Sequence, residues 1–537
     1  MAAQRMLVVS LLLGVASGAL PGSGLAANAT DTAAGAATAC EALRAANVAH
    51  TRIDVAEPVA AGAFKAPASG FPFPVYYSKL PAFCRVAGSI QPSADSDIRF
   101  ELWLPASGWN GRFMQTGNGG AAGSVVHSSL VEPLARGYAV ANTDTGHQGG
   151  MGDFAWAVGH PEKLTNYAHR AVHELTVAGK ALTTAYYGRA PAKAYWYGCS
   201  TGGRQGLKEA QRYPSDYDAI VAGAPANNWS PLMALSILTQ RNLGGPDGLG
   251  LDKLALLKEA AIAACDKQDG VEDRVIGAPR KCHFDPASLA CRAGEPHAGE
   301  DRAVEPQRCL GAAEVAAAQR IYRGVVDGRG RTRIPGTGPG SEPAWAAYST
   351  PQFAIGSNYF RNVIARDATW DARGFDVDRD LARAEQADAG AAVAMDPDLG
   401  PFFAHGGRLI LYHGTTDGLI PYGNSVDYFD SVVRKLGKQR TSAAMRFYLV
   451  PGMDHCSAGE GAYEIDWLGA MEGWVEQGHA PGALAARHPA EAPPNPMGPP
   501  APPGKAFTRP LCAYPALARY SGQGDGADAA HFTCAAQ

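Results

Sequence analysis

The sequence lacks a strong excess of charge of either sign. Lysine and arginine number 47, against 51 aspartate and glutamate residues, so the formal net charge of the 537-residue chain is −4. A protein that binds a polyanion usually presents a basic surface that attracts its partner electrostatically. The charge balance therefore argues against nucleic acid as a partner.

Long hydrophobic runs are also missing, with one exception at the N-terminus. A short basic start is followed by the apolar stretch MLVVSLLLGVASGAL, residues 6–20. This run has the length of a signal-peptide core and is short for a membrane span, and small residues follow it. We expect residues 1–26 to be a signal peptide and the protein to be secreted or periplasmic, without membrane attachment after cleavage. An uncleaved anchor is the alternative.

Cysteine is present in an even number, ten residues, in a chain that we expect to be exported. Disulfide bonds are the ordinary state of cysteine in that compartment, although the sequence alone leaves many pairings open. The length exceeds what one small core needs. We therefore expect either one large domain with an insertion or two to three domains.

The order of apolar and polar residues predicts strands that alternate with helices. Strand patterns occur in IRFELWL, GRFMQT, GYAVANT, AYWYG and YDAIVAG, and a helical pattern ends at Pro214. Such alternation indicates an α/β fold with a parallel sheet. The pattern loosens over residues 227–404 and returns in RLILYHG and MRFYLV. We predict an α/β domain in two parts, residues 27–226 and 405–537, with the middle block inserted; the second part includes a Pro-rich stretch, residues 492–504.

Gly198, Ser200 and Gly202 form the pattern G-x-S-x-G between a predicted strand and a predicted helix. This context is that of the nucleophile elbow of α/β hydrolases, in which glycines permit a strained turn that presents the serine hydroxyl. The predicted fold is therefore an α/β hydrolase with a large inserted lid domain. The pattern also arises by chance, and a structural serine is the alternative.

A serine nucleophile needs a base and an acid that orients the base, and in this architecture they follow in the order serine, acid, histidine. Asp417 comes just after the strand RLILYHG, and His455 comes just after MRFYLV. The carboxyl ends of such strands carry functional loops. We predict Asp417 as the acid and His455 as the base, with Asp454 as a weaker rival for the acid. An ordinary loop residue is the alternative for each.

Two cysteines adjoin this predicted constellation. Cys199 precedes Ser200, and Cys456 follows His455. A disulfide between them would bring their α-carbons to about 4.4–6.8 Å and would tether the turn of the nucleophile to the loop of the base. The rival hypothesis makes Cys199 itself the nucleophile, but burial beneath the elbow and an exported setting argue against it.

The stretches GCSTGGRQG, YHGTTDGLIP and PGMDHC together resemble the tannase and feruloyl esterase family, which also contains MHETase, a hydrolase of mono(2-hydroxyethyl) terephthalate. Further similarity, in YPSDYDAIVAGAPANNW, RDATWDARGFDVDRD and the C-terminal tail, spans nearly all of the mature chain. The resemblance implies that Ser200 is the nucleophile, His455 the base and Asp417 the acid. It also implies five disulfides: Cys40–Cys84, Cys199–Cys456, Cys265–Cys282, Cys291–Cys309 and Cys512–Cys534.

An oxyanion hole needs two backbone N–H groups. One should belong to Thr201, the residue after the nucleophile, and the other to Gly119 or Gly120, where a missing side chain lets the backbone approach the substrate. The same loop, from Gly117, also fits the dinucleotide pattern G-x-G-x-x-A, with Asp144 farther along. We expect no organic cofactor, because a nicotinamide site would leave the predicted triad unexplained.

A second candidate site lies within the insertion. Asp266, Asp269 and Asp273 could bring carboxylate oxygens into one tight turn, and hard oxygen ligands suit Ca²⁺. The spacing is not that of an EF-hand, and a solvated acidic turn is the alternative. The family resemblance implies a structural calcium ion in the lid, with backbone carbonyls at Val271 and Val275 as further ligands.

The resemblance implies a secreted serine carboxylesterase that hydrolyses esters of hydroxyaromatic acids such as ferulate, coumarate or gallate. An MHETase-like hydrolase is the alternative within the class, although Thr201 stands where MHETase has an acidic residue. Outside the class, the sequence leaves open a peptidase and a secreted aromatic-binding protein without turnover.

The insertion also offers candidate residues for substrate binding. Arg361 or Arg366 could bind a substrate carboxylate, and an ordinary surface arginine is the alternative for each. Aromatic residues of the insertion could contact the substrate ring, though we expect most in the core: Trp345, Phe353, Tyr359, Phe360 and Trp370. The sequence does not report the oligomeric state.

Overall fold

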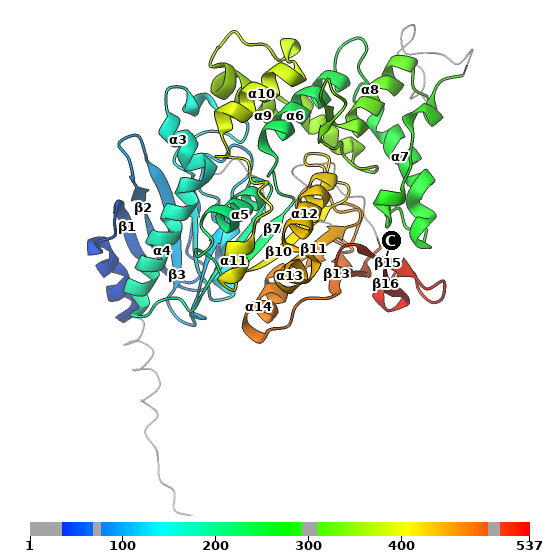
Figure 1. Ribbon diagram of the computed structural model, residues 1–537. Helices are drawn as coiled ribbons and strands as arrows, with labels where there is room; N and C mark the ends of the chain where they lie inside the picture. The colour runs from blue at the N-terminus through cyan, green and yellow to red at the C-terminus, as the bar shows by residue number, and fades with distance from the viewer. Residues whose placement is uncertain (1–34, 68–76, 293–308, 492–504, 537) are drawn as a thin grey trace, which may run out of the picture.

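A nine-stranded sheet forms the centre of the computed structural model, which describes residues 35–67, 77–292, 309–491 and 505–536 (Figure 1). The strand order is β1-β2-β3-β5-β4-β6-β7-β10-β11. Neighbours from β1 to β5 pair antiparallel, and those from β5 to β11 pair parallel. The strands are β1 (Thr51–Val59), β2 (Phe83–Ile90), β3 (Ile98–Pro105), β4 (Arg112–Thr116), β5 (Ala139–Thr143), β6 (Lys193–Cys199), β7 (Ala219–Gly223), β10 (Arg408–Gly414) and β11 (Met445–Val450). The predicted signal peptide and Pro-rich stretch lie outside the described residues.

The central strands are buried on both faces, which explains why most of their residues are apolar. All five residues are buried in β5, which reads AVANT, and in β7, which reads AIVAG. Successive side chains of a strand point to opposite faces. Along β10, Leu409 and Leu411 accordingly join one core, and Ile410 and Tyr412 join the other.

Helices cover both faces of the sheet (Figure 1). One face is packed by α4 (Ala171–Tyr187), α5 (Thr201–Arg212) and α12 (Tyr422–Leu436), and the other by α2 (Val131–Ala135) and α14 (Trp467–Gln477). α13 (Lys438–Ala444) precedes β11. The segments α3 (Pro161–Thr165) and η5 (Asn166–Arg170), a π-helix, lead into α4. The predicted helical pattern and the predicted α/β hydrolase architecture are both confirmed.

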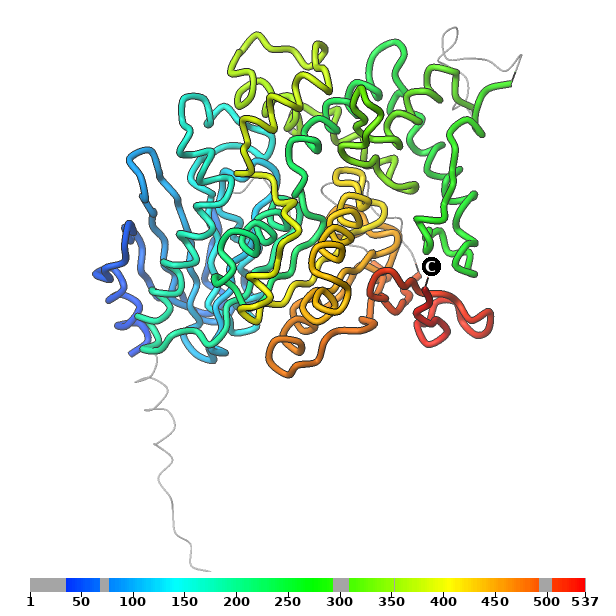
Figure 2. The backbone as a smooth tube through the Cα atoms, in the orientation of Figure 1, coloured from blue at the N-terminus to red at the C-terminus, as the bar shows by residue number. Residues whose placement is uncertain are grey.

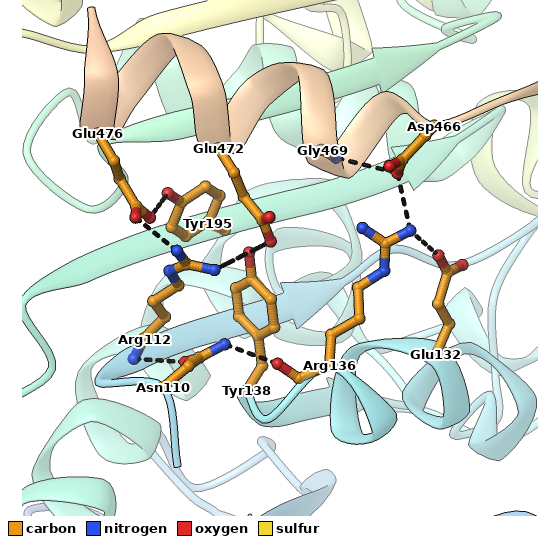
Figure 3. Close-up of polar contacts among 10 residues, drawn as sticks. All are labelled: Asn110, Arg112, Glu132, Arg136, Tyr138, Tyr195, Asp466, Gly469, Glu472 and Glu476. Atoms are coloured by element: carbon orange, nitrogen blue, oxygen red, sulfur yellow. Dashed lines mark hydrogen bonds and ion pairs between the residues drawn. The ribbon is translucent and has the colours of Figure 1, made fainter. Parts of the chain in front are cut away.

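A buried polar network joins α14 to the sheet (Figure 3). The hydroxyl of Tyr195 donates to Glu476 at 2.5 Å, and Tyr138 donates to Glu472. Arg112 lies 3.0 Å from Glu472 and 2.5 Å from Glu476, so one guanidinium serves both carboxylates. Burial, followed by these carboxylates, raises the pKa of both tyrosines far above the usual value, and they remain neutral donors.

The insertion leaves the sheet after β7 and returns at β10. Figure 2 shows most of this green-to-yellow segment along the top and right of the molecule. Its elements are α6 (Trp229–Leu243), α7 (Leu254–Cys265), α8 (Ala312–Arg323), β8 (Val325–Val326), β9 (Thr332–Ile334), α9 (Ile355–Tyr359), the π-helix η11 (Phe360–Ala365), α10 (Val377–Asp388) and α11 (Gly400–Ala404). The insertion is thus largely helical and contributes only two short strands, β8 and β9, among its described residues.

One face of α5 holds the returning end of the insertion, residues 390–396. Buried Arg204 donates to the carbonyls of Ala168 at 2.9 Å and Ala392 at 3.3 Å. Lys208, one turn on, donates to the carbonyls of residues 390 and 393, and Gln211 donates to those of residues 394 and 396. Three side chains at helical spacing therefore bind the insertion to the helix that follows Ser200.

The C-terminal tail forms small antiparallel sheets beside the insertion (Figure 1). They consist of β12 (Glu464–Ile465), β13 (Leu484–His488) and β14 (Phe507–Leu511), and of β15 (Ala516–Tyr520) paired with β16 (Phe532–Ala536). Arg509, on β14, contacts Asp273 of the insertion. No helix in the described part of the chain is long and apolar enough to span a membrane.

All five disulfides that the resemblance implied are present. Four of them join cysteines separated by 17 to 44 positions. Cys199–Cys456 instead spans 257 positions, with α-carbons 5.9 Å apart. The described residues contain no free cysteine.

Candidate active site

Ser200 lies in a sharp turn between β6 and α5. Its φ of 63° and ψ of −124° place a non-glycine residue in a strained region, as in a nucleophile elbow. Glycines allow the close packing around it: a Cβ at Gly198 would lie 2.7 Å from the backbone carbon of Gly202, and one at Gly117 would lie 2.4 Å from its Cα. The Ser200 N–H donates to the carbonyl of Gly223 at 3.0 Å, which fixes the turn against β7.

Asp417 and His455 meet at the same edge of the sheet. His455 Nδ1 lies 2.7 Å from Asp417 Oδ2. Asp417 Oδ1 accepts the backbone N–H groups of Leu419 and Ile420 at 2.9 and 2.8 Å, and His413 Nε2 lies 3.2 Å from Oδ2. Burial alone would raise the pKa of Asp417, but His455 and His413 hold it well below the usual value. Asp417 is therefore a fixed negative charge behind the imidazole.

The geometry favours Asp417 over its rival Asp454. Asp454 accepts a hydrogen bond from Thr416 Oγ1 at 3.0 Å, whereas Nδ1 of His455 faces Asp417. Burial raises the pKa of Asp454 to about 6, so this carboxyl is a weaker permanent charge than Asp417. Because Nδ1 of His455 donates to Asp417, Nε2 is left as the basic nitrogen.

The disulfide Cys199–Cys456 links the serine turn directly to the histidine loop. We call the loops that carry Ser200, Asp417 and His455 the candidate catalytic edge. Among the described residues, the Ser200 hydroxyl makes no hydrogen bond. Such contacts are often long before substrate binds, and the disulfide keeps the two loops within reach of each other.

The oxyanion loop, residues 117–122, packs against the start of α5. Within the described chain, the N–H groups of Gly119, Gly120 and Thr201 make no hydrogen bond to protein. Gly120 has a φ of +53°, and a Cβ there would lie 2.4 Å from the carbonyl oxygen of Met151. All three predicted donors are therefore available to a ligand, and position 120 requires glycine. The structure does not choose between Gly119 and Gly120.

Asp144 does not fit the role of a ribose ligand in a dinucleotide site. It is buried, and its Oδ1 accepts the backbone N–H groups of Arg99 and Gly146 at 3.0 and 2.8 Å. Burial raises the pKa of Asp144 to about 8. The carboxylate of Asp144 is therefore engaged by the backbone, and the glycine loop packs against Gly202, at the start of α5.

The acidic loop, residues 265–282, is closed by the disulfide Cys265–Cys282. Its turn requires Gly270, which has a φ of +100°. Asp266 accepts the backbone N–H groups of residues 273 and 274, and Asp269 accepts that of Val271. Burial, and then the neighbouring carboxylates, raises the pKa of Asp269 to about 6, although Arg509 opposes the shift. Carboxylate oxygens are ligands that suit Ca²⁺, but in the described structure those of Asp266, Asp269 and Asp273 do not all come within 4.8 Å of one another, and Asp273 contacts Arg509.

A tighter group of potential ligands lies elsewhere and was not predicted. In the described segments, His173, Glu209 and Asp216 form the one set of three such side chains whose ligand atoms all lie within 4.8 Å. His173 Nδ1 lies 2.6 Å from Asp216, and Lys180 donates to the Asp216 backbone carbonyl. The set joins α4 to the end of α5, and the partly buried Lys180 already supplies positive charge there.

The aromatic candidates of the insertion are mostly core residues, as expected. Tyr359 and Phe360 are buried in one core, against which Phe353 and Trp370 are partly buried, and Trp345 is buried in a separate core of the insertion. The candidate arginines differ: Arg361 donates to the carbonyl of Trp370 and to Asn358, and Arg366 is exposed. Neither arginine is placed against a substrate by these contacts.

A cavity of about 520 Å³ opens on the α14 side of the sheet. It is lined by Tyr197 and Cys456 and by charged residues that include Arg136 and Asp466, which pair at 2.7 Å (Figure 3). Its lining includes none of the three triad candidates. We therefore do not assign it to the ester substrate.

Known proteins resemble this chain over most of its length. The chain matches the family model for tannase and feruloyl esterase over residues 84–535. It is 36% identical to an uncharacterized esterase of Xanthomonas campestris in an alignment of 560 positions, gaps included, which covers 94% of this chain and 92% of that protein. It is 32% identical to the probable feruloyl esterase B-2 of Aspergillus terreus, across 84% of this chain and 86% of that one.

Solved structures give the same result. The crystal structure of feruloyl esterase B from Aspergillus oryzae superposes with a TM-score of 0.81 at 30% identity, covering 93% of this chain and all of that one. Tannin acyl hydrolase from Aspergillus niger superposes with a TM-score of 0.74 at 25% identity, covering 93% and 95%.

The sheet, the serine elbow and the acid–histidine pair define an α/β hydrolase. The sequence and structural matches are more specific. The chain belongs to the tannase and feruloyl esterase family, and it is a carboxylic ester hydrolase.

Proposed function

We propose that the enzyme hydrolyses esters of hydroxyaromatic acids, of the feruloyl or galloyl type, through an acyl-enzyme on Ser200. The observation that carries this proposal is the Asp417–His455 pair, whose loop is joined by a disulfide to the serine elbow. Similarity to a feruloyl esterase B and to a tannin acyl hydrolase supports the choice of acid.

The proposed reaction begins when Ser200 Oγ attacks the ester carbonyl carbon while His455 Nε2 takes the hydroxyl proton. The tetrahedral intermediate collapses, the carbon–oxygen bond to the alcohol breaks, and His455 returns the proton to the leaving alcohol. Water then attacks the acyl-enzyme by the same route and releases the acid and free Ser200. Asp417 holds the imidazole in the required tautomer and stabilises its positive charge, because its own pKa is low.

The negative charge that forms on the carbonyl oxygen needs donors that are already in place. The N–H of Thr201 and an N–H from Gly119 or Gly120 are free for that purpose in the described structure. Preorganised donors of this kind commonly supply about 3–4 kcal/mol each to transition-state stabilisation. The helix α5, which begins at Thr201, adds the positive end of its dipole at the same place.

The proposal is tested by a substrate panel with the wild-type enzyme and the Ser200→Ala variant. The panel contains methyl ferulate, methyl gallate, chlorogenate, mono(2-hydroxyethyl) terephthalate and a peptide amide. We expect the highest kcat/KM on a hydroxyaromatic ester and a loss of about a millionfold in kcat in the variant. Highest activity on the terephthalate ester or the amide would overturn the substrate class, and equal rates in both proteins would overturn the mechanism.

We also propose export of the protein and a structural calcium ion in the acidic loop. Five disulfides support an oxidising compartment. The carboxylates of Asp266, Asp269 and Asp273, with the carbonyls of Val271 and Val275, would hold the ion. Bound calcium would offset the repulsion among these carboxylates and stabilise the fold of the insertion, and it has no role in the ester chemistry.

A further inference from the structure

The carbonyl of Gly120, in the oxyanion loop, receives two hydroxyl hydrogen bonds. Thr201 Oγ1 donates to it at 2.7 Å, and the hydroxyl of Tyr167 donates at 3.0 Å. Thr201 is 1% exposed and Tyr167 is 2% exposed, so water does not compete strongly for this oxygen. Two buried donors on one carbonyl make a specific restraint on the loop.

The peptide between Gly120 and Ala121 is restrained at both ends. Its carbonyl is held by Thr201 and Tyr167, and its N–H, on Ala121, donates to the Met151 carbonyl at 2.6 Å. The C=O and N–H of a trans peptide point in opposite directions, so these contacts fix the plane of the peptide. The orientation of Gly120 follows from that plane.

The preceding peptide is restrained as well. The carbonyl of Gly119 accepts the N–H of Ala122 at 2.9 Å, which turns the N–H of Gly120 to the opposite side. The carbonyl of Ala121 faces His147 Nε2 at 2.7 Å. The carbonyls of the turn are thus occupied by protein, whereas the N–H groups of Gly119 and Gly120 make no hydrogen bond within the described residues.

We propose that Thr201 is a positioning residue for the oxyanion hole through its side chain, in addition to offering its backbone N–H, and that Tyr167 shares this role. This inference rests on the proposed function of Ser200. The Thr201 hydroxyl ties the donor that follows the nucleophile to the loop that carries the second donor. This side-chain bond restrains the spacing between the two donors, together with the backbone bond from the Gly202 N–H to the Asn118 carbonyl at 2.8 Å.

The environment of Tyr167 keeps its hydroxyl protonated and its side chain in place as a hydrogen-bond donor to Gly120. Burial raises its pKa to about 12, so the hydroxyl keeps its proton and remains a donor. The guanidinium of Arg204 lies over its ring at 4.9 Å and donates to its backbone carbonyl at 3.3 Å. The tyrosine is thereby fixed from the side of α5, the same helix that begins at Thr201.

The test compares Thr201→Val, which keeps the shape and removes the hydroxyl, with Thr201→Ser, which keeps the hydroxyl. On methyl ferulate, or on the best ester of the panel, we expect Thr201→Val to lower kcat about tenfold to a hundredfold with KM within about threefold. We expect Thr201→Ser to retain kcat within about threefold. An arylboronic acid, which forms a tetrahedral adduct with the serine, should bind Thr201→Val more weakly in proportion to the loss in kcat, while the affinity for ferulate stays unchanged.

A second variant tests whether the two hydroxyls act on one carbonyl. Tyr167→Phe alone should lower kcat less than Thr201→Val, and the double variant should lose less than the product of the single effects. Wild-type kcat in Thr201→Val, or an equal loss in Thr201→Ser, would overturn the inference. Ser200→Ala separates the two proposals, because full activity in that variant would overturn the proposed mechanism itself.

Discussion

The candidate catalytic edge and the acidic loop of the insertion are each closed by a disulfide, but the two bonds do different work. Cys199–Cys456 joins residues 257 positions apart and brings together loops that the chain order keeps separate. Cys265–Cys282 spans 17 positions and closes a loop that is already local. The first assembles a site from distant parts, and the second shapes a single turn.

The carboxylates of the two regions differ in the same way. At the candidate catalytic edge, Asp417 has a pKa below its usual value because two histidines and backbone N–H groups stabilise its charge. In the acidic loop, burial and like charges raise the pKa of Asp269 to about 6. The charge of Asp417 is stabilised by groups of the protein itself, whereas the proposed calcium ion would stabilise the charges of the loop. Changes at the edge should therefore alter the rate, and changes in the loop should alter stability.

The strongest test of the comparison is Asp417→Asn. We expect kcat to fall about 10⁴-fold, because the amide cannot stabilise the imidazolium or enforce its tautomer. The melting temperature should change little relative to this loss. The matched control is Asp454→Asn, one position before His455, and steady-state kinetics should place it within about tenfold of wild type. An equal loss in both variants would show that Asp417 is not the orienting acid.

Removal of the two disulfides gives the next largest effect. Cys199→Ala with Cys456→Ala should lower the free energy of unfolding by about 4–5 kcal/mol and should also lower kcat, because the two loops are no longer joined. Cys265→Ala with Cys282→Ala should lower it by about 3 kcal/mol and leave kcat at 25 °C unchanged. Denaturant unfolding and ester hydrolysis measure the two effects. If the two double variants have equal kcat values, the proposal that only the Cys199–Cys456 disulfide supports catalysis is wrong.

Calcium should act on the acidic loop alone. At a free calcium concentration about a hundredfold above Kd, binding stabilises the folded state by about 2.7 kcal/mol, so a chelator should lower the melting temperature by several degrees. Initial rates at 25 °C should be the same with and without chelator. Asp273→Asn should remove the response to calcium, whereas the exposed Asp285→Asn, just outside the loop, should keep it. If the melting temperature of the wild-type enzyme is the same with and without calcium, the proposed calcium site is wrong.

His147, which contacts the carbonyl of Ala121 in the oxyanion loop, provides the smallest expected effect, and it is an effect on stability. Burial lowers its pKa to about 4, whereas an unfolded histidine titrates near 6.5. The unfolded state therefore binds the proton first, and stability falls as pH drops from 6.5 towards 4, by about 2 kcal/mol at pH 5. His147→Gln should lose correspondingly less stability between pH 7 and pH 5 in denaturant unfolding. An identical pH response in the variant would show that another group is responsible.

The sheet and the triad candidates could be predicted from the sequence because their signals are local. Buried strands give apolar runs, and the elbow needs glycines at fixed offsets from Ser200. The contact of Thr201 with Gly120 was not predicted, because it depends on how a separate loop folds onto α5. The ligand group His173–Glu209–Asp216 was missed for the same reason, since its members come from two helices and a turn.

The hydrogen bonds from α5 to residues 390–396 also have no signature in the sequence. Arg204, Lys208 and Gln211 look like surface residues of an ordinary helix, yet each donates to carbonyls of the returning insertion. Such contacts bind backbone atoms, which any residue offers, so composition does not report them.

These hydrogen bonds between α5 and residues 390–396 limit how the inserted lid domain can move. A rigid movement of the whole insertion away from the sheet would have to break the bonds that Arg204, Lys208 and Gln211 donate to it, or displace Ser200 relative to His455. Any motion of the insertion that keeps these bonds intact must therefore involve its portions far from residues 390–396. The returning end of the insertion is thus anchored to the same helix that positions the serine, and the two should move together.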